Sequence, residues 1–486
     1  MENAYKTRIF QEIGVDVAEI QASNWIDGKA SLPGSDPTKI FDPASGELIG
    51  HFQASDSSEV ARAVKAAKAA QSHWWALGAQ RRTEMLGQVA ANLRNLSQSL
   101  ASIESREMGK PLAMAQEDIE GSADLLEHQI SGANDFFAET NSDLGRLVRK
   151  PYGVAALITP WNYPVCQVTD VIGALLSAGN TVVVKPSEKA PLSVAALSEV
   201  FSCLPPGVVN IVLGNGSTGS ALIEHPDVDL VHFTGSVATG RKVGAAAGGR
   251  LIPCFLELGG KDPLVIDEGV DIEWAAEMAV HGSLFNTGQV CTSIERIYVH
   301  KKIAEPFIAE VVNQASKWTV GPGNDPINKL GPLIDADQRD LIHAQVFEAQ
   351  LKGAQVLIGG EPIPGPGFFY PPTVVLNPPD DSRLMTEETF GPVITVCVVE
   401  SFEEGIKRAN ASSYGLSASA LTKNPENIEE ASRLNAGAIT INGGGTGPED
   451  PPFEPVKASG SGRIFFGPKS LESYTTAYAV NIGEAK

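Results

Sequence analysis

The chain has 486 residues, a length that predicts about three domains of ordinary size. Hydrophobic residues make up 43% of it and charged residues 20%, a composition typical of a folded globular protein rather than a disordered one. The 58 acidic side chains outnumber the 37 basic ones, and the net charge of −21 disfavours binding to nucleic acids and to anionic membrane surfaces.

The cysteines and histidines bear on compartment and metal content. Five cysteines, an odd number, are scattered along the chain, which argues against a disulfide framework and for a reducing compartment. None of them forms a Cys-x-x-Cys pair, and the histidines show no metal-ligand spacing, so no metal site is predicted. The first 20 residues lack the apolar core of a signal peptide, and no stretch reaches the roughly 18 apolar residues of a membrane span. We therefore expect a soluble, cytoplasmic protein.

The first third of the chain is helical in pattern, since apolar residues recur at helical spacing in 60–67 and 85–93. From Pro151 onward, short β-branched runs alternate with helical stretches. Strands interleaved with helices in this way predict βαβ units and a parallel sheet. The predicted strands of this series are 154–159, 181–185, 208–213 and 229–235.

A second series of strands follows the pair Gly259-Gly260, which we take as the boundary between two tandem α/β domains. The tail at 475–482 alternates like a strand, and a solitary strand needs a partner, either a second subunit or its own chain. The strands of the second series are 263–267, 296–300, 355–359, 393–399, 417–421 and 438–442.

Two glycine-containing segments are possible phosphate sites. Residues 214–219 satisfy Gly-x-Gly-x-x-Gly after a predicted strand, but Thr234 stands where a Rossmann fingerprint needs an acidic residue. Residues 233–236 close a strand and open a helix, where free N–H groups could meet an anion. Ser236 is also a good N-cap, so an ordinary strand-to-helix turn accounts for this segment equally well.

Cys291 lies among small and polar residues in the segment 285–293, whereas Cys203, Cys254 and Cys397 lie in apolar runs typical of buried structural thiols. A thiol nucleophile needs a base, and no histidine stands in a matching motif, which disfavours a Cys-His hydrolase. Glu257, just before the twin glycines, could activate water, although a surface acid at a strand end is the alternative.

Seven motifs in order and spacing resemble the aldehyde dehydrogenase superfamily nearly end to end. Glu257 and Cys291 are 34 positions apart and Asn162 and Lys185 are 23 apart, as the family has them. The motifs are PWN (160–162), KPSE (185–188), FTGS (233–236), LELGGK (256–261), GQVCT (288–292), EETFGP (387–392) and SGSGR (459–463).

The resemblance implies two tandem parallel-sheet α/β domains, one Rossmann-like and cofactor-binding, the other catalytic, with a small β element for oligomerisation. It places the cofactor-binding domain at 1–124 and 151–258 and the catalytic domain at 259–448. Residues 125–150 and 449–486 would form the oligomerisation element of a homodimer or homotetramer.

The same resemblance implies a covalent route from aldehyde to carboxylic acid. Cys291 matches the nucleophile that forms a thiohemiacetal, and then a thioester once hydride has passed to the nicotinamide. Asn162, with the Cys291 backbone N–H, matches the oxyanion hole, and Glu257 matches the base that activates the hydrolytic water. Coenzyme A-acylating relatives generally lack that glutamate, so its presence favours release of the free acid.

A dinucleotide cofactor is implied, with NAD preferred and NADP possible, because the Glu188 carboxylate would repel a 2′-phosphate. The resemblance implies that different residues contact the adenine, the adenosine ribose, the pyrophosphate and the nicotinamide ribose of the cofactor. The predicted cofactor-binding residues are Ile158, Pro160, Trp161, Lys185, Glu188, Gly216, Phe233, Gly235, Ser236, Leu258, Glu388 and Phe390.

Three departures from the family pattern bear on the substrate. Residues 452–455 read PFEP in place of PFGG, and 442–447 are glycine-rich where many relatives carry an aromatic. Gln167 and Asp170 are polar where relatives are often apolar. We therefore expect a wide, partly polar aldehyde pocket, lined by Tyr163, Gln167, Asp170, Phe285, Val290, Thr292 and Gly447.

Three alternative functions are compatible with some of these sequence motifs. A coenzyme A-acylating semialdehyde dehydrogenase is disfavoured by Glu257. A catalytically silent structural relative is disfavoured because a set of five site residues is retained together: Cys291, Glu257, Asn162, Lys185 and Glu388. A thiol hydrolase needs only the same cysteine and glutamate. Reduction of NAD by a small-molecule aldehyde, with and without coenzyme A, separates these alternatives.

Overall fold

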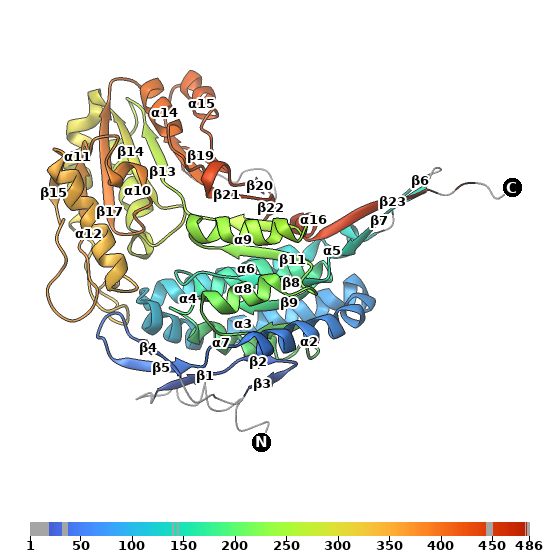
Figure 1. The fold of residues 1–486 in the computed structure, drawn as a ribbon. Helices are drawn as coiled ribbons and strands as arrows, with labels where there is room; N and C mark the ends of the chain where they lie inside the picture. Colours follow the sequence, from blue (N-terminus) through green and yellow to red (C-terminus); the bar gives the residue numbers. More distant parts are fainter. Residues whose placement is uncertain are drawn as a thin grey trace.

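The computed structural model describes residues 19–31, 37–138, 140–142, 145–443, 451–481 and 483. Figure 1 shows two lobes, each built on a sheet flanked by helices, and a slender arm that projects from the first lobe. The first lobe, in blue to green, carries the amino-terminal half, and the second, in yellow to orange, carries most of the rest. No helix among the described residues combines the length and the apolarity needed to cross a membrane.

The sheet of the first lobe is parallel at its centre and antiparallel at both edges. Parallel pairing joins β8 to β9, for example, with Ala156 opposite Val183. In spatial order its described strands are β21 (Gly460–Ser461), β12 (Cys254–Glu257), β11 (Leu230–Thr234), β8 (Val154–Ile158), β9 (Thr181–Lys185), β10 (Val209–Ile211), β2 (Trp25–Ile26) and β3 (Lys29–Ala30).

Both faces of this sheet are covered by helices, which explains why its parallel strands are mostly apolar. Val154 and Ala156 of β8 pack into one core cluster, and Ala155 and Leu157 pack into the other, as the two-residue period of a strand requires. One face is covered by α2 (Ser57–Ala76), α8 (Gly216–Glu224) and α9 (Val237–Gly249). The other is covered by α3 (Gly78–Met108), α4 (Leu112–Ser131), α6 (Pro164–Ser177) and α7 (Leu192–Phe201).

The sheet of the second lobe begins directly after the twin glycines, because β12 belongs to the first sheet and β13 to the second. All its described strands are parallel except the edge strand β15. In spatial order they are β15 (Gln355–Ile358), β16 (Thr373–Leu376), β17 (Val393–Val399), β14 (Ile294–His300), β13 (Asp262–Ile266), β18 (Ser417–Leu421) and β19 (Ala438–Ile441).

Helices again cover both faces of the second sheet, so its core lies in clusters on either side. Short helical turns join several of the other elements. The helices are α10 (Ile272–Leu284), α11 (Lys301–Ala315), α12 (Ala336–Leu351), α14 (Phe402–Asn410) and α15 (Pro425–Ala431), and the turns are η1 (Phe285–Gly288), α13 (Arg383–Thr386), η2 (Lys457–Ser459) and α16 (Ser470–Ser473).

The arm in Figure 1 is a three-stranded antiparallel sheet in which β7 lies between β6 and β23. The predicted terminal strand is confirmed, and within this chain it pairs with β7. Two further small sheets lie near the chain ends. The bounds are β6 (Thr140–Ser142), β7 (Gly145–Pro151) and β23 (Thr475–Asn481) in the arm, β1 (Ile20–Ala22), β5 (Leu48–Phe52) and β4 (Thr38–Phe41) in one small sheet, and β20 (Pro452–Phe453) and β22 (Ile464–Phe465) in the other.

The predicted α/β fold is confirmed, with local corrections. The helices predicted in the first third are present as α2 and α3, but the strands β1 to β5, which were not predicted, precede them. The predicted strand at 355–359 exists but runs antiparallel at an edge, and β16 was not predicted. Residues 125–131 complete α4, which packs on α3 and α6, so the segment assigned to oligomerisation begins inside the first lobe. The domain boundaries stay predictions.

Candidate active site

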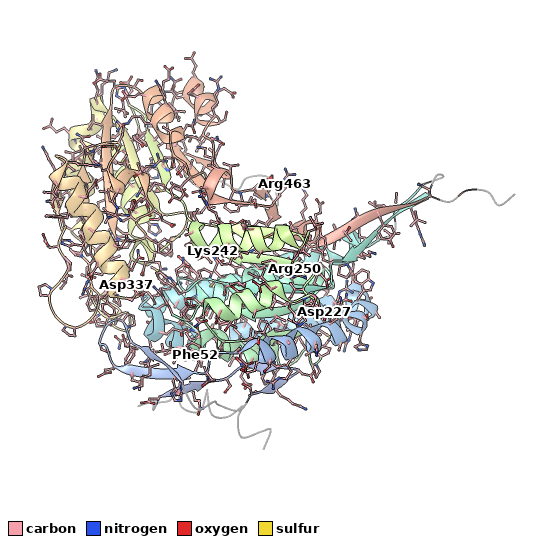
Figure 2. All side chains as sticks on the ribbon, viewed as in Figure 1. Phe52, Asp227, Lys242, Arg250, Asp337 and Arg463 are labelled. Atoms are coloured by element: carbon pink, nitrogen blue, oxygen red, sulfur yellow. The ribbon has the colours of Figure 1, made fainter. Side chains whose placement is uncertain are left out.

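A cavity of about 720 Å³ lies where the carboxyl ends of the first sheet's parallel strands face the second lobe. The three predicted catalytic residues and every predicted cofactor residue line it. Helix α9 contributes from one lobe and α12 from the other. Figure 2 labels Lys242 on α9 and Asp337 at the start of α12, near these two walls.

The backbone before Cys291 is held in an unusual turn. Asn286, Thr287 and Gly288 have φ values of 49°, 59° and 70°, a left-handed conformation that is strained for the two non-glycine residues. A Cβ at Gly288 would lie 2.0 Å from the carbonyl oxygen of Gly391, so only glycine fits there. The strained turn therefore sets the position of Cys291.

Asn162 ties the first lobe to this turn. Its side-chain amide donates to the carbonyl oxygen of Gln289 at 2.9 Å, and the amide of Asn286 donates back to the carbonyl oxygen of Asn162 at 3.1 Å. Both side chains are buried. Asn162 follows β8 in the first sheet, so these bonds set the loop after β8 against the cysteine turn of the second lobe.

Glu257 ends β12 and reaches the same cavity. A Cβ at Gly260 would lie 2.5 Å from the carbonyl oxygen of Cys291, so the twin-glycine segment passes directly against the cysteine backbone. Burial raises the pKa of Glu257 well above its usual range, and its Oε1 has no hydrogen-bond partner among the described residues. Burial, and then the negative charge of Glu257, raises the pKa of the Cys291 thiol to about 12.

Lys185 and Glu188 form one wall of the cavity beyond β9. The Lys185 ammonium lies 3.4 Å from the Glu188 carboxylate, and the lysine side chain is 6% exposed whereas the glutamate is 46% exposed. Burial lowers the pKa of Lys185, and Glu188 opposes that change. The pair thus presents a fixed cation and an accessible carboxylate to a ligand with hydroxyl groups.

The strand-to-helix turn at 233–236 opens α9 toward the cavity. The Ser236 hydroxyl accepts from the N–H of Thr239 at 3.3 Å, so the predicted N-cap is confirmed. A Cβ at Gly235 would lie 2.7 Å from the Phe233 ring, which keeps this position free of a side chain. The positive end of the α9 dipole therefore faces the cavity, and no side chain at Gly235 shields it.

Glu388 and Phe390 reach the cavity from the second lobe. The Phe390 ring meets the Trp161 ring edge to face at 5.5 Å between centroids. The Glu388 carboxylate accepts from the N–H of Gly260 at 3.2 Å, and burial raises the pKa of Glu388 to about 8. These contacts close the cavity between the lobes.

Among the residues that the structure describes, the predicted aldehyde-pocket residues do not all line the cavity, unlike the predicted catalytic and cofactor residues. Gln167 lines the cavity. The Asp170 carboxylate instead accepts from Ser122 on α4 at 2.5 Å, and burial raises the pKa of Asp170 to about 7. The Tyr163 ring lies 3.5 Å from the Lys110 ammonium.

The other predicted pocket residues do not line this cavity in the described part of the chain. The Phe285 ring packs on His281 at 5.2 Å between centroids, and Val290 and Thr292 flank Cys291 along the chain. Gly447 lies outside the described residues. A role for these residues in aldehyde binding stays a prediction.

Sequence reasoning missed several cavity-lining residues. Those on α9 could have been found by following one face of the helix that starts at Ser236, but those on α12 belong to no motif. The missed residues are Thr159, Ser187, Gly219, Ser220, Ile223, Glu224, Thr234, Thr239, Lys242, Val243, Ala246, Gly259, Gln338 and Leu341.

The sequence and the fold are both similar to those of known proteins. A sequence model of the aldehyde dehydrogenase family matches residues 31–480. The structure is similar to lactaldehyde dehydrogenase from Escherichia coli, with a TM-score of 0.92 and 31% identity over 96% of this chain and 100% of that chain. Betaine aldehyde dehydrogenase from Staphylococcus aureus, solved with NAD+, matches with a TM-score of 0.90 and 30% identity over 94% of each chain.

A third solved relative is 3,6-anhydro-L-galactose dehydrogenase in complex with NADP. It matches with a TM-score of 0.90 and 32% identity over 95% of this chain and 100% of that chain. The family model and these relatives each span nearly the whole chain. The chain therefore belongs to the aldehyde dehydrogenase family.

Proposed function

We propose that this protein oxidises an aldehyde to the free carboxylic acid with NAD+, through a thiohemiacetal and a thioester on Cys291. The observation that carries the proposal is the meeting of Cys291, Glu257 and Asn162 on one cavity, which the predicted cofactor residues also line. In this proposal the first lobe holds the cofactor and the second supplies the nucleophile.

The first chemical step forms a bond between the Cys291 sulfur and the carbonyl carbon. The raised pKa of the thiol means that its proton must leave to solvent as the sulfur attacks, which leaves Glu257 free to act as a base later. Negative charge then develops on the carbonyl oxygen. The Asn162 amide has two N–H donors, of which one bonds Gln289, so the second can stabilise that oxygen.

The second step hydrolyses the thioester. Glu257 takes a proton from water as the water oxygen bonds the acyl carbon, the carbon–sulfur bond breaks, and Glu257 passes that proton to the leaving Cys291 thiolate. A carboxylate with a raised pKa is a stronger base than an exposed one, which suits it to this task. The acid leaves and the thiol is restored.

The residues around the cavity fit a dinucleotide. Lys185 and Glu188 offer a cation and a carboxylate for ribose hydroxyls, and the start of α9 offers free N–H groups for a pyrophosphate. The bare turn at Gly235 leaves room for close approach of a phosphate to the backbone. NAD+ bound there would accept the hydride that the thiohemiacetal loses.

One experiment separates this proposal from the alternatives. Purified protein is assayed for NAD+ reduction by a panel of aldehydes that includes lactaldehyde and betaine aldehyde, with and without coenzyme A, beside an ester-cleavage control. Acid production that is independent of coenzyme A supports the proposal. Absolute dependence on coenzyme A favours the acylating activity, and ester cleavage without any aldehyde oxidation favours a hydrolase.

NAD+ is expected to be preferred over NADP+. A 2′-phosphate on the adenosine ribose would meet the exposed Glu188 carboxylate, and repulsion of about 1 kcal/mol between charges about 4 Å apart in water predicts a preference of about fivefold or more. Glu188→Gln keeps the shape but removes the charge, so it should reduce the preference. Steady-state kinetics with both cofactors measure this, and a lower KM for NADP+ in the parent protein contradicts it.

The arm is proposed to join subunits into a symmetric homodimer or homotetramer. Within the described strands β23 pairs with β7 along one edge only, and an edge strand of seven residues exposes a row of unpaired N–H and C=O groups. Tyr478 on β23 and Leu147 on β7 are also exposed apolar side chains. A second copy of the chain would cover both features.

Deleting residues 476–486 is expected to give monomers or aggregates and to reduce activity, although no cavity residue is removed. This cut retains Tyr474, which is buried and contacts His232 on β11, so the first lobe keeps its core. Deleting only 484–486 is the matched control. Light scattering measures the mass, and an unaltered mass after the longer deletion, or a monomeric parent, would refute the arm as an interface.

A further inference from the structure

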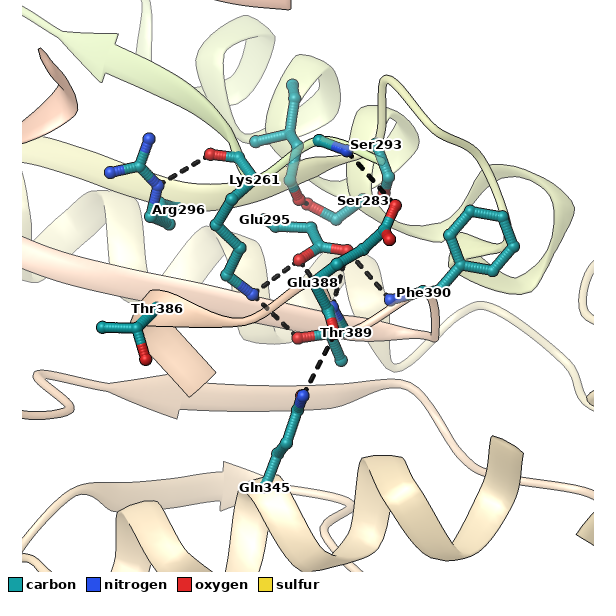
Figure 3. A network of polar contacts seen from close by, with 12 residues as sticks. Lys261, Ser283, Ser293, Glu295, Arg296, Gln345, Thr386, Glu388, Thr389 and Phe390 are labelled. Carbon is teal, nitrogen blue, oxygen red and sulfur yellow. Dashed lines mark hydrogen bonds and ion pairs between the residues drawn. The ribbon is translucent and has the colours of Figure 1, made fainter. Parts of the chain in front are cut away.

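A buried carboxylate outside the cavity accepts hydrogen bonds from the loop that carries Glu388 and Phe390. Glu295 lies on β14, and its carboxylate accepts from the backbone N–H of Thr389 at 2.9 Å and from that of Phe390 at 2.9 Å (Figure 3). Its side chain is 5% exposed. The two bonds are made to backbone groups, so they fix the path of the loop rather than one side chain.

Lys261 contacts both the Glu295 carboxylate and the loop. It follows the twin glycines, and its fully buried ammonium lies 2.5 Å from the Glu295 carboxylate and donates to the Thr389 hydroxyl at 2.8 Å. A buried ion pair offsets its desolvation cost only when its remaining hydrogen bonds are satisfied. Here they are satisfied by the loop, so the pair and the loop depend on one another.

The loop needs such support because its conformation is strained. Phe390 has a φ of 55°, which a bulky residue rarely adopts. Gln338 on α12 donates to the carbonyl oxygens of Thr389 and Phe390 at 3.0 and 3.1 Å, while Gln345 on α12 donates to that of Glu388 at 3.1 Å. The N–H groups are thus held by Glu295 and the carbonyl groups by α12.

We propose that Glu295, paired with Lys261, is a positioning residue for the cofactor. The pair holds the loop so that the Glu388 carboxylate and the Phe390 ring face the cavity, and neither member of the pair lines the cavity itself. This inference rests on the proposed function, because it takes Glu388 and Phe390 as contacts of NAD. Loss of the pair should weaken cofactor binding but leave the chemistry of Cys291 intact.

The test compares the parent protein with Glu295→Gln and Glu295→Asp. Gln has nearly the same shape but lacks the charge and turns an N–H₂ group toward N–H donors, whereas Asp keeps the charge with a shorter reach. We expect Glu295→Gln to bind NADH about tenfold more weakly, as measured by NADH fluorescence, and to raise the KM for NAD+ similarly. Glu295→Asp should lie between it and the parent.

Ester cleavage without cofactor supplies the readout that separates positioning from general damage. It needs Cys291 but no NAD+, so Glu295→Gln should retain it within about twofold. Asp267→Asn is the matched control, since Asp267 is also buried in the second lobe and accepts from Thr422 and Asn427 without contact to the loop. This control should leave NADH affinity unchanged.

The possible results distinguish two failures. A parent that binds no NADH refutes the proposed cofactor and with it this inference. A parent that binds NADH with the same affinity as Glu295→Gln refutes the inference alone, as does parallel loss of ester cleavage and NADH binding. If Glu295→Gln does not fold, Glu295→Asp carries the test, because its shorter side chain keeps the charge but cannot make the same bonds to the loop N–H groups. Parent-like NADH affinity in Glu295→Asp then overturns the inference.

Discussion

Replacing Cys291 with alanine is expected to lower aldehyde oxidation by about 10⁴-fold or more, because the covalent path cannot begin without the thiol. The substitution removes one sulfur atom from a turn whose shape is set by the backbone of residues 286–288 and by Asn162. The fold and NADH affinity should therefore be unchanged. NAD+ reduction, thermal unfolding and NADH fluorescence on the same preparation measure the three properties.

Cys203→Ala and Cys254→Ala are the matched controls for this variant. Both cysteines are free thiols of intermediate exposure, as Cys291 is, but neither lines the cavity. Their loss should change stability at most. Substantial turnover in Cys291→Ala, or loss of turnover in either control, would show that another residue is the nucleophile.

Glu257→Gln is expected to separate the two chemical steps. The amide is nearly isosteric with the carboxylate but cannot take a proton, so thioester hydrolysis should slow by about 10²- to 10⁴-fold. Acylation should still occur, with solvent as the proton acceptor. Stopped-flow absorbance should then show a burst of NADH, close to one per active site, followed by slow turnover. Steady-state loss without any burst would contradict the assignment.

The pH dependence of the parent protein follows from the same group. Burial raises the pKa of Glu257 well above its usual range, so the carboxyl is protonated and inactive as a base until the pH exceeds that raised value. Hydrolysis should therefore accelerate as the pH rises through it and fail as the pH falls below it. In Glu257→Gln this rise should be absent. Identical pH profiles in the two proteins would place the base elsewhere.

The central strands and the cavity residues could be predicted because their signals are local. β8 and β9 are continuous apolar runs bounded by glycine, proline or asparagine, and such runs fold as strands covered on both faces. Cys291 stood out because its neighbours are small and polar, and Glu257 because it precedes two glycines. The motifs then placed the other predicted cofactor residues on strand ends and turns, while the further lining residues on α8, α9 and α12 were missed.

Features that depend on distant contacts could not be predicted. The short strands before α2 carry too few residues to show a period, and the antiparallel pairing of β15 with β16 leaves no mark in the sequence of β15. The polar Asp170 indicated a polar aldehyde pocket, yet its carboxylate bonds Ser122 on a helix far away in sequence. Glu295 lies just before the predicted strand 296–300 and gave no signal, because its partners are backbone groups 94 and 95 positions away.

The measurement that tests the central proposal most directly is mass spectrometry of the acylated protein. Glu257→Gln is mixed with an aldehyde that it oxidises and NAD+, quenched in acid after the burst, and digested. The proposal predicts that the acyl group is attached through a thioester to the peptide that contains Cys291, and that hydroxylamine removes it. A burst of NADH with no acyl adduct, or an adduct on any other residue, would contradict it.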